Sequence, residues 1–178
     1  MRKILISLIL ACSFSLISPN AATSQGKAIL IGSQLERGFD MGVNSSEGKT
    51  DWLVKENGNF HLAYPAGQAW GAVFITVGKP KDPPRPSEDF STYKTLVLEM
   101  KGQADGGAVL IGIKTNTHPD DGSELKTTVK LTKEWRTYHI PLEAFSGVDL
   151  KRLYVVTEFV FEGPIPRTVF IRKISFRK

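Results

Sequence analysis

The chain has 178 residues, of which 41% are hydrophobic and 23% are charged, so length and composition fit one ordinary globular domain. Its formal net charge is +5, and its lysines and arginines are spread along the chain, with basic pairs only at scattered positions. No basic run with interleaved aromatic residues is present. This pattern argues against a nucleic-acid partner.

The N-terminal residues have the three parts of a secretory signal peptide. Arg2 and Lys3 precede an apolar run over residues 4–17, and small and polar residues follow as far as Ser24. The apolar run is shorter than the roughly 20 residues that span a bilayer, and no later stretch is as apolar. We therefore predict a signal peptide over residues 1–23, a single secreted or periplasmic domain over residues 24–178, and no transmembrane segment.

Cys12 allows a second interpretation of the N-terminal residues, as the signal of a lipoprotein. Residues 9–12 resemble a bacterial lipoprotein signal, in which the cysteine becomes the acylated first residue, although the apolar residues that continue beyond Cys12 argue against this route. If the signal is cleaved conventionally, the mature chain has no cysteine. No disulfide, thiolate chemistry or cysteine metal site is then expected.

From residue 27 onward the apolar residues recur with the period of two that is typical of β-strands. Asn57 and Gly58 lie between two alternating runs and predict a hairpin. The stretch 32–50, rich in Gly, Asn and Ser, predicts a loop, and the prolines of residues 78–86 predict a crossover loop. Strands are predicted over residues 28–31, 51–55, 59–64, 70–77, 95–101, 108–114, 125–131, 133–142, 153–161 and 168–176.

The run 153–161 is almost wholly apolar. A strand with apolar side chains on both faces must be covered on both faces, which places this strand in the middle of a sandwich. About ten strands at regular spacing, with no long helical pattern, predict an all-β fold of two packed sheets.

Glu158 interrupts this apolar run, and a buried carboxylate is costly unless it is paired. It is predicted either to face a binding groove or to form an ion pair with Lys114 or Arg172. Gly112 leaves one face of the strand 108–114 without a side chain, beside Lys114. Such a glycine indicates either a β-bulge or space for a ligand.

Several short motifs, taken in order, resemble a known domain. They comprise residues 58–62 before a strand opened by 70–71, residues 89–96 leading into a strand that ends at 101–102, residues 134–142, and the closing strand 169–174. Together they resemble the galactose-binding-like jelly roll of non-catalytic carbohydrate-binding modules and of complex I intermediate-associated protein domains, over residues 39–176. The resemblance implies a jelly-roll β-sandwich of two antiparallel sheets, with sugar bound on the concave sheet or at the loop tips.

The resemblance also implies that a structural calcium ion can lie near the chain ends, often held by an Asp in the last strand. This chain has Arg172 and Lys173 there, so we expect no cofactor, with calcium as the open alternative. Residues 120–124 carry three carboxylates, but their spacing does not match a known calcium loop, and a solvated loop is the favoured interpretation. No metal set is recognised in the spacing of the three histidines, His61, His118 and His139.

Sugar rings stack on flat aromatic side chains while polar groups at the rim bind the hydroxyls. Trp135 is interpreted as a core residue that opens a strand, and Trp70, beside Gly71, also suits a packing role. The aromatic residues near the hairpin ends are the better candidates. The predicted ligand-binding residues are Trp52, His61, Tyr64, Trp70 and Glu158.

No nucleophile motif and no pair of carboxylates on one strand face is recognisable, so no catalytic residue and no enzyme is predicted. We therefore expect a secreted, non-catalytic binding module whose ligand, by the resemblance, is a carbohydrate. A protein-interaction or assembly module on the same fold is the alternative. A small glycoside-active enzyme is a third hypothesis, which would require two carboxylates in one cleft.

Overall fold

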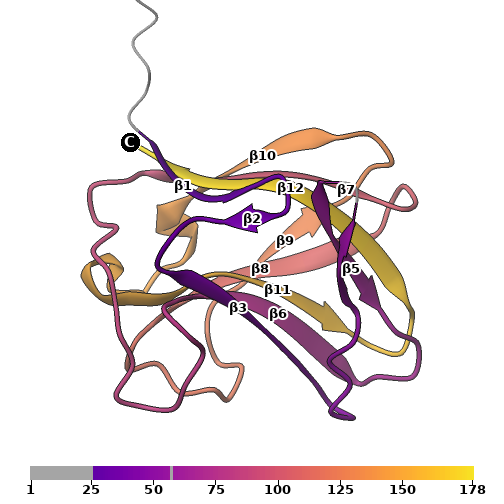
Figure 1. The fold of residues 1–178 in the computed structure, drawn as a ribbon, viewed down its shortest axis with the longest axis horizontal. Helices are drawn as coiled ribbons and strands as arrows, with labels where there is room; N and C mark the ends of the chain where they lie inside the picture. Colours follow the sequence, from indigo (N-terminus) through magenta and orange to yellow (C-terminus); the bar gives the residue numbers. More distant parts are fainter. Residues whose placement is uncertain (1–25, 57) are drawn as a thin grey trace, which may run out of the picture.

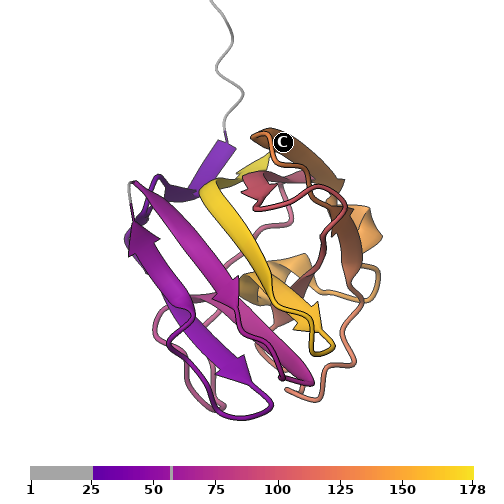
Figure 2. The ribbon, with the colours of Figure 1, turned by 90° about the vertical axis from the view of Figure 1, so that its right-hand side faces the viewer.

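The computed structural model describes residues 26–56 and 58–178, which form two antiparallel sheets packed face to face (Figures 1 and 2). This confirms the all-β, two-sheet sandwich. The predicted signal peptide and Cys12 lie outside the described residues. The strands are β1 Gly26–Ile31, β2 Gln34–Leu35, β3 Phe39–Ser45, β4 Leu53–Glu56, β5 Asn59–Tyr64, β6 Trp70–Val77, β7 Thr95–Gly102, β8 Ala108–Thr115, β9 Thr127–Lys130, β10 Arg136–Pro141, β11 Leu153–Glu162 and β12 Arg167–Arg177, with short 3₁₀ turns η1 Leu142–Ala144 and η2 Leu150–Arg152.

Sheet A contains the strands β10-β7-β12-β1-β2 in that order, and β5 and β4 extend it. The long strand β12 organises this sheet, because its first half pairs with β5 and its second half with β1, while β7 runs along its other side. The pairing of Gly26 with Arg177 places the C-terminus beside the start of β1 (Figure 1).

Sheet B contains the strands β3-β6-β11-β8-β9 in that order. The apolar strand β11 pairs with β6 on one side and β8 on the other, so it is the central strand, as its sequence predicts. Its residues 153–161 are all buried. One face of β11 contributes Val156, Phe159 and Phe161 to the core, and the other face forms the floor of a groove.

The core lies between the sheets and is filled by the inward-facing residues of each strand. On β8, Val109, Ile111 and Ile113 point into it, in the alternation that the sequence predicts. Phe145, which follows η1, is 2% exposed and closes one end of the core. The core therefore fixes which face of every strand of sheet B is turned outward.

The interpretation of residues 32–50 as a loop is wrong in part, because β3 lies within it and forms an edge of sheet B. Phe39, Met41 and Val43 alternate there and pack against the core. Asp40, Gly42 and Asn44 occupy the alternate positions, and these residue types disfavour strands. Because these residues lie on the outer face, the alternation typical of a strand was not recognised in the sequence.

Among residues 26–56 and 58–178, no helix is long and apolar enough to cross a membrane.

Candidate functional site

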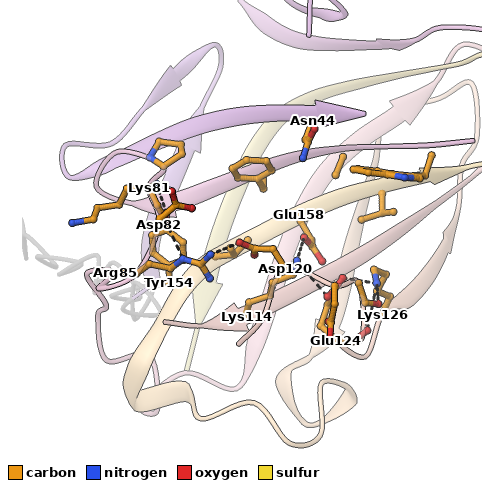
Figure 3. Close-up of a pocket in the computed structure, with 18 of the residues that line it drawn as sticks. Asn44, Lys81, Asp82, Arg85, Lys114, Asp120, Glu124, Lys126, Tyr154 and Glu158 are labelled. Carbon is orange, nitrogen blue, oxygen red and sulfur yellow. Dashed lines mark hydrogen bonds and ion pairs between the residues drawn. The ribbon is translucent and has the colours of Figure 1, made fainter. Parts of the chain in front are cut away.

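A groove of about 780 Å³ lies on the outer face of sheet B. Strand alternation supplies most of its floor, because every second residue of β6, and of β11 from Glu158 onward, points away from the core. The loop after β6 and the loop after β8 form its walls (Figure 3). The floor residues include Ala72, Phe74, Val155, Glu158 and Val160.

An aromatic surface occupies the β3–β6 side of the floor. Phe74 pairs across strands with Gly42, and a Cβ atom at residue 42 would lie 2.4 Å from Phe74 Cε2. The ring of Phe74 therefore lies over Gly42 in the space that a side chain would take. Trp70 projects from the same face of β6, four residues earlier, and is 41% exposed. Two aromatic side chains thus line the groove in succession.

A buried carboxyl group lies at the centre of the groove. Glu158 is 2% exposed, and its Oε2 lies 3.2 Å from Lys114 Nζ. Its other oxygen, Oε1, has no hydrogen-bond partner in the part of the chain that the structure describes. Burial raises the pKa of Glu158 to about 8, and Glu124 adds to this shift while Lys114 opposes it.

A second carboxylate, Glu124, joins this group from the loop after β8. Its Oε2 lies 3.3 Å from Lys114 Nζ, and its Oε1 forms an ion pair with Lys126. Burial alone would raise the pKa of Glu124, but hydrogen bonds with Glu158 and Lys126 lower it to about 2. Burial likewise opposes the charge of Lys114, yet the two carboxylates raise the pKa of that lysine. The cluster holds Lys114 charged between one ionised and one protonated carboxyl group.

Arg85 joins the two loops at the start of β11. Its Nε donates to Lys81 O at 3.1 Å, its Nη1 donates to His118 O at 3.0 Å, and its Nη2 pairs with Asp120 (Figure 3). The guanidinium lies 5.2 Å from the ring centroid of Tyr154. The walls of the groove are therefore tied together at this end.

Of the five predicted ligand-binding residues, Trp70 and Glu158 line the groove. Glu158 fulfils both alternatives that the sequence left open, since it faces a groove and pairs with Lys114. Arg172 lies on sheet A and pairs with Glu99 instead.

Trp52 and Tyr64 require a correction. They are 3% and 1% exposed, because both side chains fill the core at one end of the sandwich. Tyr64 stacks on Phe161 at 5.0 Å between ring centroids, and Trp52 meets both rings edge-on at 5.6 Å. Neither ring has a free face for a sugar.

His61 also lies away from the groove, on the outer face of sheet A. Its ring stacks on Phe170 at 4.7 Å, and its Nδ1 lies 3.8 Å from Glu56. Trp135, interpreted as a core residue, lies on the same sheet and is partly exposed, with Arg172 4.4 Å from its ring centroid. The structure therefore separates His61 from Trp70 and Glu158.

Several groove residues were not identified from the sequence, among them Asn44, Phe74, Arg85 and Tyr154. For Phe74 a signal existed, since residues 70, 72 and 74 share one face of a strand whose other face is core. For Arg85 there was none, because its role depends on two loops meeting in space.

The residues at the last strand do not fit the calcium ion that the resemblance implies. The structure places Arg172 in an ion pair with Glu99, on the outer face of sheet A. Residues 26–56 and 58–178 contain no group of three or more His, Cys, Asp or Glu side chains that could hold a metal ion.

The sequence model of a family described as carbohydrate binding domain 30 matches residues 32–178. Among solved structures, the chain is similar to the family 30 carbohydrate-binding module of the cellulosomal cellulase Cel9D-Cel44B of Clostridium thermocellum. The two are 21% identical with a TM-score of 0.63, over 86% of this chain and 98% of that chain. At this identity the likeness shows the fold.

Family 29 carbohydrate-binding modules have the same fold. A variant of CBM29-2 complexed with mannohexaose is 16% identical, with a TM-score of 0.58 over 85% of this chain and 90% of that chain. Another variant, complexed with cellulohexaose, is 16% identical with a TM-score of 0.57 over 85% and 89%. No curated protein sequence matches the chain.

Proposed function

Because the chain belongs to the carbohydrate binding domain 30 family and is a non-catalytic carbohydrate-binding module, we propose that the groove of sheet B is its sugar site. We propose further that the ligand is a neutral, β-linked hexose chain. One observation carries this assignment: the groove combines the exposed ring of Trp70 and the half-buried ring of Phe74 with a buried carboxyl oxygen that lacks a partner among the described residues.

The aromatic side chains suit the apolar face of a sugar ring. Phe74 lies over Gly42, and Trp70 presents an exposed ring at the end of the groove where β6 begins. Stacking on such rings removes C–H surface from water without requiring a charge on the ligand. A linear chain can cover both rings in succession, because Trp70 and Phe74 project from the same face of one strand.

The polar groups suit hydroxyls. Glu158 Oε1 is buried and unpartnered among the described residues, so a ligand hydroxyl that reaches it can donate a hydrogen bond to it. Leaving such an atom unsatisfied costs about 1–3 kcal/mol, which a ligand would recover. Asn44 adds an amide on the β3 side of the groove.

The charges of the lining favour a neutral ligand over an acidic one. The lining carries five carboxylates, Asp82, Asp120, Asp121, Glu124 and Glu162, and the protonated Glu158, against four basic residues, Lys81, Arg85, Lys114 and Lys126. Arg85, Lys114 and Lys126 are already paired with carboxylates. A uronic acid in the groove would face an excess of like charge.

Calorimetric titration with cellohexaose and mannohexaose tests the assignment. Trp70→Ala and Phe74→Ala should each weaken binding about tenfold, which corresponds to about 1.4 kcal/mol. His61→Ala is the matched control, because that ring lies on the opposite sheet. If His61→Ala abolishes binding and Trp70→Ala leaves it unchanged, the sugar site lies on sheet A instead. A folded protein that binds neither these sugars nor other neutral β-glycans would favour the protein-partner alternative.

We also propose that the domain acts outside the cytoplasm. The support is the predicted signal peptide over residues 1–23, with acylation at Cys12 as the alternative route. The mass of the processed chain from the membrane and soluble fractions distinguishes the two. Cleavage before Ser24 without lipid supports export as a soluble domain, and a lipid adduct on Cys12 supports the alternative.

A further inference from the structure

The two walls of the groove meet at the end where β11 begins. Arg85, on the loop between β6 and β7, pairs with Asp120, on the loop between β8 and β9. Strands β6 and β8 flank β11, so this contact joins the two loops across the first residues of β11 (Figure 3). Tyr154 lies directly beneath it, with its ring 5.2 Å from the Arg85 guanidinium.

This bridge is fixed by a set of buried contacts. The Arg85 side chain is 5% exposed and donates to two backbone carbonyls, Lys81 O at 3.1 Å and His118 O at 3.0 Å. The Tyr154 hydroxyl accepts from Lys81 N at 2.9 Å. A bidentate or multiply bonded guanidinium holds its partners in one geometry. The Arg85–Asp120 bridge is therefore held in one position by buried contacts, unlike an ion pair between two exposed side chains.

The opposite end of the groove is exposed. Trp70 is 41% exposed there, and Ala69 and Glu162 are exposed beside it. Between Tyr154 and Glu162 the floor follows β11 for eight residues, which at about 3.3 Å per residue is about 26 Å. Along β11 the groove is thus exposed at Trp70 and bridged at Tyr154.

We propose that this groove takes a glycan chain by one of its ends, so that the terminal sugar lies against Tyr154 and the chain leaves past Trp70. This inference rests on the proposed function and specifies its ligand. A chain bound by its middle would have to continue through the Arg85–Asp120 bridge. A terminal sugar needs no such path, and it carries one hydroxyl that is free because no further sugar is attached. Asp120, whose side chain is 60% exposed, offers a carboxylate to that hydroxyl.

The number of binding sites per mass of polymer tests the proposal. A soluble glucomannan is titrated into the protein before and after limited cleavage by an endo-acting hydrolase that multiplies the chain ends. If the groove binds ends, the number of sites per gram rises in proportion to the ends. A number of sites that stays constant while the ends multiply overturns the proposal and leaves the proposed function intact. If neither glucomannan nor either hexaose binds, the proposed function fails, and this inference fails with it.

Variants of the bridge provide a second readout. Asp120→Ala removes the exposed half of the bridge, and Arg85→Ala/Asp120→Ala removes both halves. On intact polymer these variants should gain sites per gram relative to the native chain, because the middle of a chain can then pass through. Asp89→Ala is the control, since Asp89 lies on the same loop as Arg85 and accepts a hydrogen bond from Ser91 N at 2.8 Å instead of taking part in the bridge. If Asp120→Ala and the double variant, both folded, gain no more sites than Asp89→Ala, the bridge does not close the groove.

Discussion

The carboxyl group of Glu158 fills the space that a side chain at residue 112 would occupy. The two residues pair directly across β11 and β8, and a Cβ atom built on Gly112 would lie 2.5 Å from Glu158 Oε1. The strand register shifts between Val155 and Glu158, so a bulge lies beside this pair. The missing side chain of Gly112 therefore makes room for a buried carboxyl group, which in turn reaches Lys114 at 3.2 Å.

Gly112→Ala should consequently disturb both stability and binding. The added methyl group must displace the Glu158 carboxyl group, and overpacking of this kind costs about 1–3 kcal/mol. Urea unfolding measures the loss in the free energy of unfolding, and hexaose titration measures the loss in affinity. Gly107→Ala is the control, because the nearest atom to its added Cβ would be Leu131 Cδ1 at 4.0 Å. Equal effects of the two substitutions would contradict the assigned role of Gly112.

Gly42→Ala should weaken sugar binding without touching the ligand. A Cβ atom at residue 42 would meet Phe74 Cε2 at 2.4 Å, so the ring must leave its position over β3. Affinity should fall about as far as in Phe74→Ala, about tenfold. In the double variant Gly42→Ala/Phe74→Ala the first substitution should add little further loss, since the ring it displaces is gone. Independent, additive losses of affinity would show that the two residues do not act through one surface.

The sequence was sufficient for the fold because its strongest pattern, the apolar run in β11, allows only a central position. The same pattern identified Glu158 as an unusual buried carboxyl group. Lys114, on the neighbouring strand β8, could therefore be predicted as a partner. What could not be predicted depends on contacts between distant segments. Arg85 and Asp120 are 35 residues apart and meet only because β6 and β8 both end beside the start of β11.

The aromatic residues show a second limit of prediction from the sequence. Trp52 and Tyr64 follow turn and hairpin signals, and nothing local distinguishes a ring that fills the end of the core from one that faces solvent. Gly71 is the reason that both rings can be buried, since a Cβ atom there would lie 2.7 Å from Tyr64 Cε2 and 3.1 Å from Trp52 Cζ2. The bare core face of β6 admits both rings. Phe74 could have been found from its alternation with Trp70, but Gly42, which makes space for it, lies on a strand that the sequence concealed.

Tyr64→Phe should lower stability and leave sugar affinity unchanged. The Tyr64 hydroxyl donates one hydrogen and can serve two carbonyls, Gln68 O at 3.2 Å and Gly163 O at 3.0 Å, inside the core. Loss of that bond costs about 1 kcal/mol or somewhat more, because the carbonyls lose a partner. Thermal unfolding and hexaose titration of the same preparation check both parts. A loss of affinity greater than in His61→Ala would place Tyr64 at the sugar site after all.

Chelation of divalent cations should leave both folding and sugar binding unchanged. In the last strand, where the resemblance implies a calcium ligand, this chain places Arg172 in an ion pair with Glu99. A cation would be repelled there, and calcium prefers sites rich in carboxylate and carbonyl oxygens. Melting temperature and hexaose affinity are measured with EDTA and with calcium. A rise in melting temperature that depends on calcium concentration would contradict this prediction and indicate a bound ion.

The stability of the domain should fall as pH rises between about 4.5 and 8. Burial raises the pKa of Glu158 from 4.5 to about 8, so across this range the unfolded chain has released a proton that the folded chain still holds. The contribution is fully present below pH 4.5 and is lost as pH rises through 8. Glu124 acts in the opposite sense, because its pKa is lowered to about 2, and its contribution is lost as pH falls from 4.5 toward 2.

Glu158→Gln isolates the first of these effects. Glutamine keeps the shape of the protonated carboxyl group, can still accept a hydrogen bond, and does not titrate. Urea unfolding at pH 5, 7 and 9 should show a free energy of unfolding that declines with pH in the native chain and declines much less in the variant. Because Lys114 keeps Glu124 as a partner at 3.3 Å, the variant should still fold. If the free energy of unfolding declines equally with pH in the native chain and in Glu158→Gln, another group causes the pH dependence. The buried carboxyl group is then ionised in the folded domain.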